Sequence, residues 1–292
     1  MVSSSTPRLS IVTITYNDPE GLAITLESLK PLFSSWAPFE WEHVVVDSSP
    51  TLNHPVLTRL PPSWPLVHVE QPPRGVYHAF NQALAVVQGT HLWFLNGGDG
   101  LHDLVVLSTV LRTLDQDPRP DLVCAGAYLT RNGTALYPTL PWRTFLRNLL
   151  GRSWMYHQGV VYRRAALTRV GLYSTSYHVA GDYDFHLRCY LAGLRGQFLG
   201  TVLVDYDMTG GSSKVTQVFQ EIKDIHRSHR AHLPRWVNWA HEIVRGFEYR
   251  RVLLFRTLSA TAVGTALRPL WWWLKRFVHT RRASGPKWPK RD

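Results

Sequence analysis

The first two thirds of the chain alternate between short apolar runs and longer amphipathic segments. The β-branched run Leu9–Thr15 predicts a buried strand, and Asn17-Asp18-Pro19 behind it predicts a helix with Asp18 as its N-cap. The same pattern predicts strands at 43–47, 66–70, 91–95, 159–162 and 201–206 and helices at 76–87, 103–114 and 182–191. Strands that alternate with helices in this way indicate an α/β fold, with a mostly parallel sheet covered by helices on both faces.

Two segments depart from this alternation. Residues 121–137 contain two strand-like runs around Asn132-Gly133, which predicts a hairpin or a mixed edge of the sheet. Residues 217–282 are mostly helical in pattern and are interrupted at Pro234 and Pro269. We therefore predict two domains, an α/β domain at 1–215 and a helical, basic, Trp-rich C-terminal extension at 216–292.

The composition is that of a folded protein in a reducing compartment. Hydrophobic residues make up 45% and charged residues 18% of the 292 positions, and 12 Trp are present, which excludes a disordered chain. The cysteines, Cys124 and Cys189, are too few for a disulfide framework or a zinc cluster. Residues 1–7 are polar and carry no secretory signal, so we expect a cytoplasmic location.

Nearly all of the net charge of +11 lies at the C-terminal end. Residues 245–292 hold 12 Lys and Arg against two acids, whereas residues 1–244 hold 20 basic and 19 acidic side chains. Proteins that bind nucleic acid spread basic side chains over the folded face that contacts phosphates. The nearly zero net charge of residues 1–244 therefore argues against nucleic acid as the partner.

The tail has the pattern of a segment that lies on a membrane surface. Its longest uncharged run, 257–267, has 11 residues between Arg256 and Arg268, whereas a spanning helix needs about 20. Trp271-Trp272-Trp273, beside Lys275-Arg276, are residue types favoured at headgroup depth. Residues 251–291 thus predict contact with an anionic membrane surface, at the inner face of the plasma membrane. The alternative is a helix whose tryptophans pack on the body.

Polar residues follow three of the predicted strands. In an open α/β sheet ligands bind at the carboxyl ends of the strands, so these residues are candidates for a binding site. They are Thr15-Tyr16-Asn17, Asp47-Ser48-Ser49 and Asn96-Gly97-Gly98-Asp99. No glycine-rich dinucleotide fingerprint, phosphate-binding P-loop or Gly-x-Ser-x-Gly elbow is present in the sequence, which argues against dehydrogenases, P-loop enzymes and serine hydrolases.

Two carboxylates have the placement that catalysis needs. Asp99 follows two glycines that let a ligand approach the backbone, and a carboxylate with open coordination suits Mg²⁺ or Mn²⁺. On spacing alone, an ordinary Gly-rich turn with a solvated Asp is the favoured alternative. Asp182 opens a predicted helix, where it serves as an N-cap, as a general base toward a substrate hydroxyl, or as both. Asp184 is expected to pair with Arg188, four residues on.

Six separated motifs, taken together and in order, resemble family 2 glycosyltransferases of the GT-A fold, most closely the bacterial polysaccharide and colanic-acid type. They cover roughly residues 8–215 and leave the tail outside the resemblance. The motifs are SIVTITYN at 10–17, VVVDSS at 44–49, GVYHAFN at 75–81, FLNGGD at 94–99, HQGVVYR at 157–163 and GDYDF at 181–185.

The resemblance implies a role for each motif. Asp47 would bind the nucleotide base, Asp99 would bind Mn²⁺ or Mg²⁺, and Asp182 would be the catalytic base. The nucleotide-sugar pocket would be lined by Thr15, Tyr16, Asn17, Asp47, Arg74, Asn81, Asn96 and Gly97. This chain departs from the family pattern at Asn96 or Gly97, where an acid is often found, at His78, where an acid is common, and at Gly181, which replaces a Glu.

Two further sites are open to two interpretations. Gly210, Gly211 and Ser212 resemble a loop that closes over donor phosphates, or form a linker into the tail. His157 would contact acceptor or phosphate, or is a polar residue satisfied at the start of a strand.

The activity that these features imply is an inverting, metal-dependent transfer of a sugar from a nucleotide-diphosphate sugar to a hydroxyl of a saccharide or lipid-linked acceptor. The alternatives are a nucleotidyltransferase, which normally has a Gly-rich, basic loop after the first strand, and a non-catalytic basic module that binds membrane or nucleic acid.

Overall fold

A computed structural model describes residues 6–33, 39–49, 55–130, 134–136, 156–207, 215–240 and 243. The chain divides into two compact units, Met1–Asn238 and Trp239–Asp292. The turn expected at Asn132-Gly133, the loop at 210–212 and the basic tail at 251–291 lie outside the described residues. The first unit carries every element discussed below.

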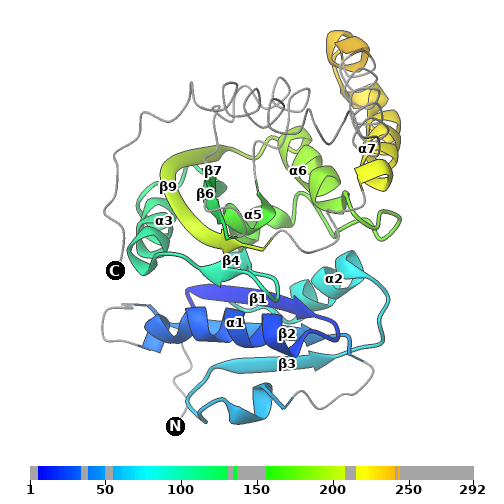
Figure 1. Cartoon of the computed structure of the whole chain (residues 1–292). Helices are drawn as coiled ribbons and strands as arrows, with labels where there is room; N and C mark the ends of the chain where they lie inside the picture. Colours follow the sequence, from blue (N-terminus) through cyan, green and yellow to red (C-terminus); the bar gives the residue numbers. More distant parts are fainter. Residues whose placement is uncertain are drawn as a thin grey trace, which may run out of the picture. The chain divides into compact units, whose positions relative to one another are not determined.

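The first unit is built on one nine-stranded sheet (Figure 1). Its strand order is β3-β2-β1-β4-β8-β6-β9-β5, and β7 pairs with β6 off this path. The strands are β1 (Leu9–Thr15), β2 (Trp41–Asp47), β3 (Leu66–Glu70), β4 (His91–Phe94), β5 (Gly100–Leu101), β6 (Leu122–Leu129), β7 (Thr134–Leu136), β8 (Val160–Arg163) and β9 (Gly196–Tyr206).

Most of these strands point the same way. β1 pairs in parallel with β2 and β4, and β2 pairs in parallel with β3. β8 runs antiparallel between β4 and β6, so β6 and its parallel neighbour β9 share the direction of β4. The carboxyl ends of β1, β2, β3, β4, β6 and β9 therefore lie along one rim of the sheet.

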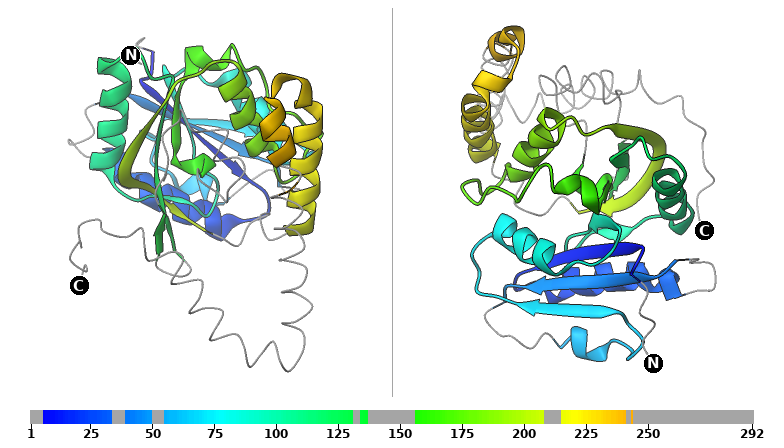
Figure 2. Two further views of the ribbon diagram at one scale, coloured as in Figure 1. Left: turned by 90° about the horizontal axis from the view of Figure 1, so that it is seen from above. Right: turned by 180° about the vertical axis from the view of Figure 1, so that it is seen from behind.

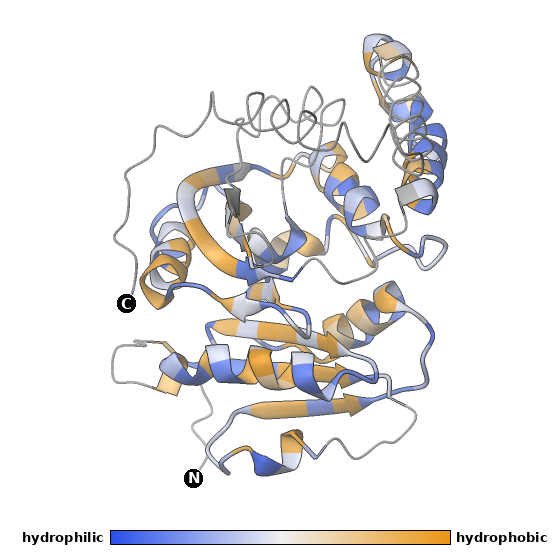
Figure 3. Ribbon diagram, in the orientation of Figure 1, coloured by the Kyte–Doolittle hydropathy of each residue, from blue (hydrophilic) through white to orange (hydrophobic). Residues whose placement is uncertain are grey.

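Helices cover both faces of this sheet (Figure 2). α1 (Pro19–Leu29) and α3 (Leu104–Gln116) bury leucines in one apolar cluster with β1 and β4 side chains such as Ile11 and Trp93. α2 (Val76–Val86), α5 (Arg164–Leu167), α6 (Gly181–Leu191) and α7 (Val215–Ser228) contribute to the cluster on the opposite face, with Val12 and Phe94. Successive residues of a strand point to opposite faces, which is why the mainly apolar central strands supply both clusters (Figure 3).

Most predicted elements are confirmed, within one or two residues at their ends. The strands at Leu9–Thr15 and Leu66–Glu70 match residue for residue, and Asp18 caps α1 by accepting a 2.8 Å hydrogen bond from the Gly21 N–H. β9 begins five residues earlier than expected, at Gly196, because its first half is only partly buried and lacks an apolar pattern. β5 has two residues and was not predicted.

α7 belongs to the α/β unit, although the sequence pattern placed a boundary near residue 215. Ile222 and Ile225 of α7, followed by Leu233 and Val237, are buried in the same cluster as Phe185 of α6. Apolar packing on the sheet unit thus continues to the end of that unit at Asn238. In the part of the chain that the structure describes, no helix combines the length and apolar character needed to cross a membrane.

Candidate active site

The end of β2 carries a buried carboxylate with one unpaired oxygen. Asp47 pairs with Thr15 in the β1–β2 register and is only 1% exposed. Its Oδ1 accepts a 2.8 Å hydrogen bond from the Ser49 N–H, whereas its buried Oδ2 has no hydrogen-bond partner among the described residues. Leaving a buried acceptor unpaired costs about 1–3 kcal/mol. Asp47 is therefore an unsatisfied buried acceptor at the carboxyl end of β2, and its contact with the nucleotide base stays a prediction.

The end of β1 lies beside Asp47. The buried Thr15 Oγ1 is likewise without a partner in the described part of the chain, and Tyr16 is 54% exposed. Asn17 has a positive φ of 49° and donates its N–H to Ser49 Oγ at 3.1 Å. A left-handed residue at this point turns the chain sharply between β1 and α1.

Hydrogen bonds between side chains extend this rim toward α2. Gln71 Nε2 donates to Ser48 Oγ at 2.9 Å, and Gln71 Oε1 lies 3.2 Å from Nδ1 of His78 on α2. Arg74 is exposed just before α2, whose preceding residue Gly75 has φ +103°. The rim therefore continues from the end of β2 through β3 to the start of α2.

The loop after β4 is held in one shape by α1. The Thr25 hydroxyl lies 3.0 Å from the Asn96 carbonyl and 2.7 Å from the Asp99 carbonyl, and it accepts a 3.1 Å hydrogen bond from the Gly98 N–H. Gly98 has φ +92°, a conformation that favours glycine. Gly97 lies against the end of β1, since a Cβ there would be 3.4 Å from the Ile14 carbonyl.

The Asp99 carboxyl at the end of this loop is buried, with 3% exposure. Its Oδ1 accepts a 2.9 Å hydrogen bond from the N–H of Asp207, the residue directly after β9. Burial raises the pKa of Asp99 to about 7, and the nearby Asp207 carboxylate adds to the rise, against hydrogen bonds from Asp207 and Gln158. The fold thus brings together two acids that are 108 positions apart.

Asp207 was not among the predicted site residues. It follows the last strand of the sheet, so the rule that was applied to β1, β2 and β4 would have found it if applied to β9 as well.

The donor set at Asp99 fits a divalent cation. The Asp207 carboxylate lies close enough to disfavour the charge of Asp99, and oxygen ligands are those that Mg²⁺ and Mn²⁺ prefer. Within the described ranges no group of three or more His, Cys, Asp and Glu side chains lies together. A cation here would complete its coordination with substrate phosphate oxygens and water, as Mg²⁺ commonly does.

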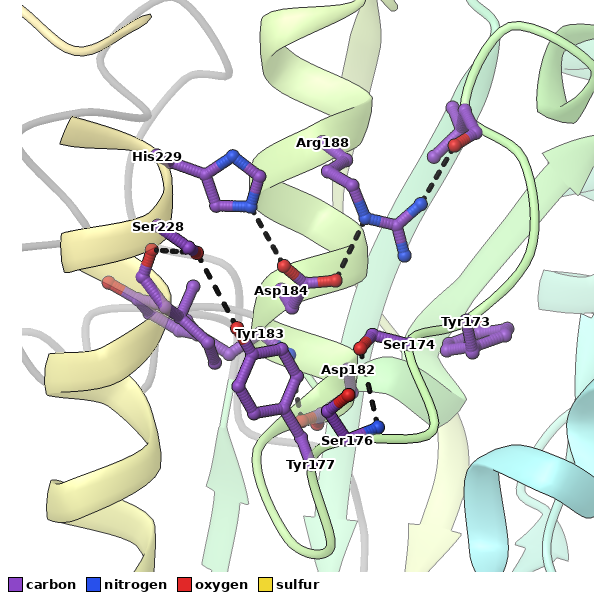
Figure 4. Close-up of polar contacts among 12 residues, drawn as sticks. Tyr173, Ser174, Ser176, Tyr177, Asp182, Tyr183, Asp184, Arg188, Ser228 and His229 are labelled. Atoms are coloured by element: carbon purple, nitrogen blue, oxygen red, sulfur yellow. Dashed lines mark hydrogen bonds and ion pairs between the residues drawn. The ribbon is translucent and has the colours of Figure 1, made fainter. Parts of the chain in front are cut away.

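Asp182 lies in the first turn of α6, at the same rim. β9 starts at the edge of the sheet opposite to this rim, and α6 ends just before β9. The beginning of α6 therefore faces the rim formed by the carboxyl ends of the strands. Asp182 is not the N-cap, because α6 begins at Gly181 and Ala180 holds that position. Its Oδ1 accepts a 2.8 Å hydrogen bond from the Tyr183 N–H (Figure 4). Burial raises the pKa of Asp182 to about 6.

Tyr77 of α2 explains why glycine precedes Asp182. A Cβ at Gly181 would lie 2.6 Å from the Tyr77 ring, which is buried, so the ring fills the space where the family pattern has a Glu side chain. The Tyr77 hydroxyl also forms a hydrogen bond with the Asp182 carboxyl, which lowers the pKa of that carboxyl and partly offsets its burial. Sequence reasoning did not single out Tyr77, because its contact with Asp182 joins distant segments.

Three other predicted residues have defined places. Asp184 pairs with Arg188 at 2.8 Å, as expected. The Asn81 amide exchanges two hydrogen bonds with the Tyr173 backbone, at 2.8 and 2.9 Å, so it ties α2 to the segment before α6, and its place in the nucleotide-sugar pocket stays a prediction. His157 is buried among Phe80, Phe94 and Tyr173, which favours the structural interpretation, and burial lowers its pKa to about 3.

Comparison with known proteins identifies the family. The profile of glycosyl transferase family 2 matches residues 10–175, more than half of the chain. The chain belongs to this family.

Its curated relatives are distant. A PGL/p-HBAD biosynthesis glycosyltransferase of Mycobacterium bovis is 28% identical over 141 residues, 48% of this chain and 54% of that protein. The chain thus spans about half the length of this relative. An uncharacterized glycosyltransferase of Mycobacterium tuberculosis is 26% identical over 213 residues, 72% of this chain and 79% of that protein.

Solved structures share the fold. S. aureus TarS 1–349 aligns with a TM-score of 0.61 at 18% identity, over 90% of this chain and 77% of that one. The mannosyltransferase PcManGT from Pyrobaculum calidifontis, solved with GDP-Man and Mn²⁺, aligns with a TM-score of 0.56 at 18% identity, over 96% and 83% of the two chains. The α/β unit has the GT-A fold that the motifs implied.

The raised pKa of Asp182 predicts a pH-dependent loss of stability. Because its pKa is about 6 in the folded chain and 3.8 ordinarily, the folded state binds more protons between these values, and stability falls as the pH rises from about 4 to about 6. The Asp182→Asn variant lacks this loss and gains on the order of 2 kcal/mol over the wild type across that interval. Urea unfolding at a series of pH values measures the difference.

Asp224→Asn is the control, since it removes an exposed carboxylate from α7. Its stability difference from the wild type should stay flat over the same interval. Parallel curves for the wild type and Asp182→Asn would show that the Asp182 carboxyl is not desolvated.

Proposed function

We propose that this chain is an inverting, metal-dependent glycosyltransferase that moves a sugar from a nucleotide-diphosphate sugar to a hydroxyl of a saccharide or lipid-linked acceptor. The observation that carries the proposal is the shared rim. This rim brings together the unpaired oxygen of Asp47, the Asp99–Asp207 pair and Asp182, whose pKa is raised. It is the edge at which α/β sheets bind ligands.

The ends of β1 and β2 form the nucleotide side of the site. The unpaired Asp47 oxygen accepts a hydrogen bond from the base. Thr15 pairs with Asp47 in the β1–β2 register, and the next residue, Tyr16, is exposed. The structural neighbours TarS and PcManGT were solved with UDP-GlcNAc and GDP-Man, respectively, which supports a nucleotide-sugar donor for this chain.

Asp99 and Asp207 hold the cation at the diphosphate side. When bound there, Mn²⁺ or Mg²⁺ neutralises the charge that develops on the departing diphosphate. Thr25 orients Asp99 through the loop backbone, so the carboxyl is in place before the donor arrives.

Asp182 takes the proton of the acceptor hydroxyl as its oxygen attacks the anomeric carbon. A base with a pKa of about 6 is ionised at neutral pH and is still a better proton acceptor than an ordinary carboxylate. The C1–oxygen bond to the acceptor forms as the C1–oxygen bond to the diphosphate breaks. One displacement inverts the anomeric configuration and needs no covalent intermediate.

The basic tail supports a peripheral membrane location for the acceptor reaction, at the cytoplasmic face. Before that tail, Trp236 at the end of the first unit and Trp239 at the start of the second are 50% and 69% exposed, and exposed tryptophans are typical of membrane-surface segments.

Nucleotide binding is the first test. We expect one of UDP, GDP, dTDP and CDP to raise the melting temperature, with a larger rise when Mn²⁺ is present, because a ligand of the folded state stabilises it. Asp47→Asn should weaken binding of that nucleotide about 10- to 100-fold, the value of a hydrogen bond to a charged group. Asp99→Asn should remove the Mn²⁺ effect. Glu27→Gln, an exposed change on α1, is the control. No rise with any nucleotide would argue against a donor site.

Turnover is the second test. With the donor sugar identified, Asp182→Asn should lower kcat about 100-fold or more, the range of general-base catalysis, and leave nucleotide binding unchanged. Product anomers are read by NMR. Full activity of Asp182→Asn, or retention of configuration, would contradict the assigned mechanism.

Membrane contact is the third test. We expect the full chain to sediment with vesicles of phosphatidylcholine and phosphatidylglycerol, less with phosphatidylcholine alone, and less in high salt. Replacing Trp271, Trp272 and Trp273 by Ala should reduce sedimentation and leave turnover on a soluble acceptor unchanged. Equal binding to both vesicle types would contradict an electrostatic contribution.

A further inference from the structure

Three consecutive backbone N–H groups in front of α6 converge on one side chain. Glu221, from the middle of α7, accepts hydrogen bonds from His178 at 2.9 Å through one oxygen and from Val179 at 2.9 Å and Ala180 at 2.8 Å through the other. Glu221 is 8% exposed. The segment that leads into Asp182 is therefore held by a buried carboxylate some 40 positions away in the chain.

α6 lacks a cap of its own. Its N-cap residue is Ala180, which has no side-chain acceptor, and no side-chain capping hydrogen bond is present at this position. Helix N-termini leave backbone N–H groups unpaired and attract negative charge. Glu221 supplies both an acceptor and a charge from another helix. Burial alone raises the pKa of Glu221, but the three N–H donors and Gln217 outweigh it, so the pKa is lowered and the side chain is ionised.

Further contacts hold α7 against α6. Gln217 Nε2 donates to Glu221 Oε1 at 3.0 Å and orients the carboxylate. The Tyr183 hydroxyl lies 2.6 Å from His226 Nε2. His229 lies 2.9 Å from Asp184, on the side of α6 where Asp184 also meets Arg188 (Figure 4). Glu221 is thus part of a rigid contact between two helices.

We propose that Glu221 is a positioning residue for the general base. Its carboxylate reaches the region beside Asp182 from α7, and it takes the place of the Glu that the family pattern has at position 181. The proposal rests on the proposed function of Asp182. The proposal extends the catalytic unit beyond residue 215, because α7 supplies the carboxylate that holds the segment in front of Asp182.

The charged and titratable groups that face Asp182 determine the sign of the effect. The Glu221 carboxylate disfavours a second negative charge on Asp182 and raises its pKa, whereas the Tyr77 hydroxyl bonds to the carboxyl and lowers it. Tyr162 and Tyr173 are buried nearby and are neutral, since burial raises their pKa values well above the ordinary value. Removing the charge of Glu221 therefore lowers the pKa of Asp182.

The test is Glu221→Gln in the full chain, which keeps the size of the side chain and removes its charge. We expect the pKa of Asp182, followed by ¹³C NMR of its carboxyl carbon and assigned with Asp182→Asn, to fall below the wild-type value. We expect faster amide exchange at His178, Val179 and Ala180. With donor and acceptor present, kcat should fall about 10- to 100-fold with little change in donor KM, the effect of a misplaced catalytic group. The acid limb of the pH profile should move to lower pH.

Asp224→Asn is the matched control, one turn further along α7 and exposed. It should leave the pKa, exchange rates and kcat unchanged. A Glu221→Gln variant that is less stable but keeps the wild-type pKa of Asp182 and the wild-type acid limb would overturn the proposal and leave Glu221 a purely structural cap.

The two proposals fail in different ways. If the wild type transfers no sugar from any donor, the proposed function fails, while the NMR and exchange measurements still report whether Glu221 controls Asp182. If Asp182→Asn is inactive but Glu221→Gln behaves as the wild type in all readouts, only the positioning role is lost.

Discussion

Parallel pairing of β1 with β2 and β4 is the constraint from which the site follows. In parallel strands the carboxyl ends meet at one edge, so Thr15, Asp47 and the loop at 96–99 share a rim whatever their separation in the chain. β9 has the same direction and adds Asp207, and the return from α6 to β9 places Asp182 there as well. The apolar clusters on both faces hold the strands in this register, so the hydrophobic core determines the geometry of the polar site.

The fold removes several carboxylates from solvent, and the partners of each carboxylate decide whether its pKa is lowered or raised. Asp184 is buried against Arg188 and His229, which lower its pKa and keep it charged. Asp99 and Asp182 have no cation among their described contacts, and burial raises the pKa of each. Because both pKa values are raised on folding, these groups make the folded state less stable as the pH rises above about 4. Raised pKa values of this kind cluster at functional sites, which agrees with the roles proposed for Asp99 and Asp182.

α7 lies outside the shared motifs, yet it packs against the helix that carries Asp182. Its apolar residues Ile222 and Ile225 join the core beneath α6, and this packing places Glu221 at the start of α6. The family match ends at residue 175, so both α6 and α7 lie beyond it. Residues beyond the family match therefore supply both Asp182, the proposed base, and its neighbour Glu221.

The sequence by itself determined the local elements and several of the carboxylates. Apolar alternation predicted the central strands, and the polar residues that end β1, β2 and β4 pointed to Asp47 and Asp99, because a strand end is a local property. Tertiary structure alone decided which groups meet: Asp207 with Asp99 over 108 positions, Tyr77 with Gly181, and Glu221 with Ala180 over 41. No periodicity encodes such pairs, because they depend on sheet order and on which helix face the core buries. The same packing gives Asp182 its raised pKa, a property of its burial that no sequence motif contains.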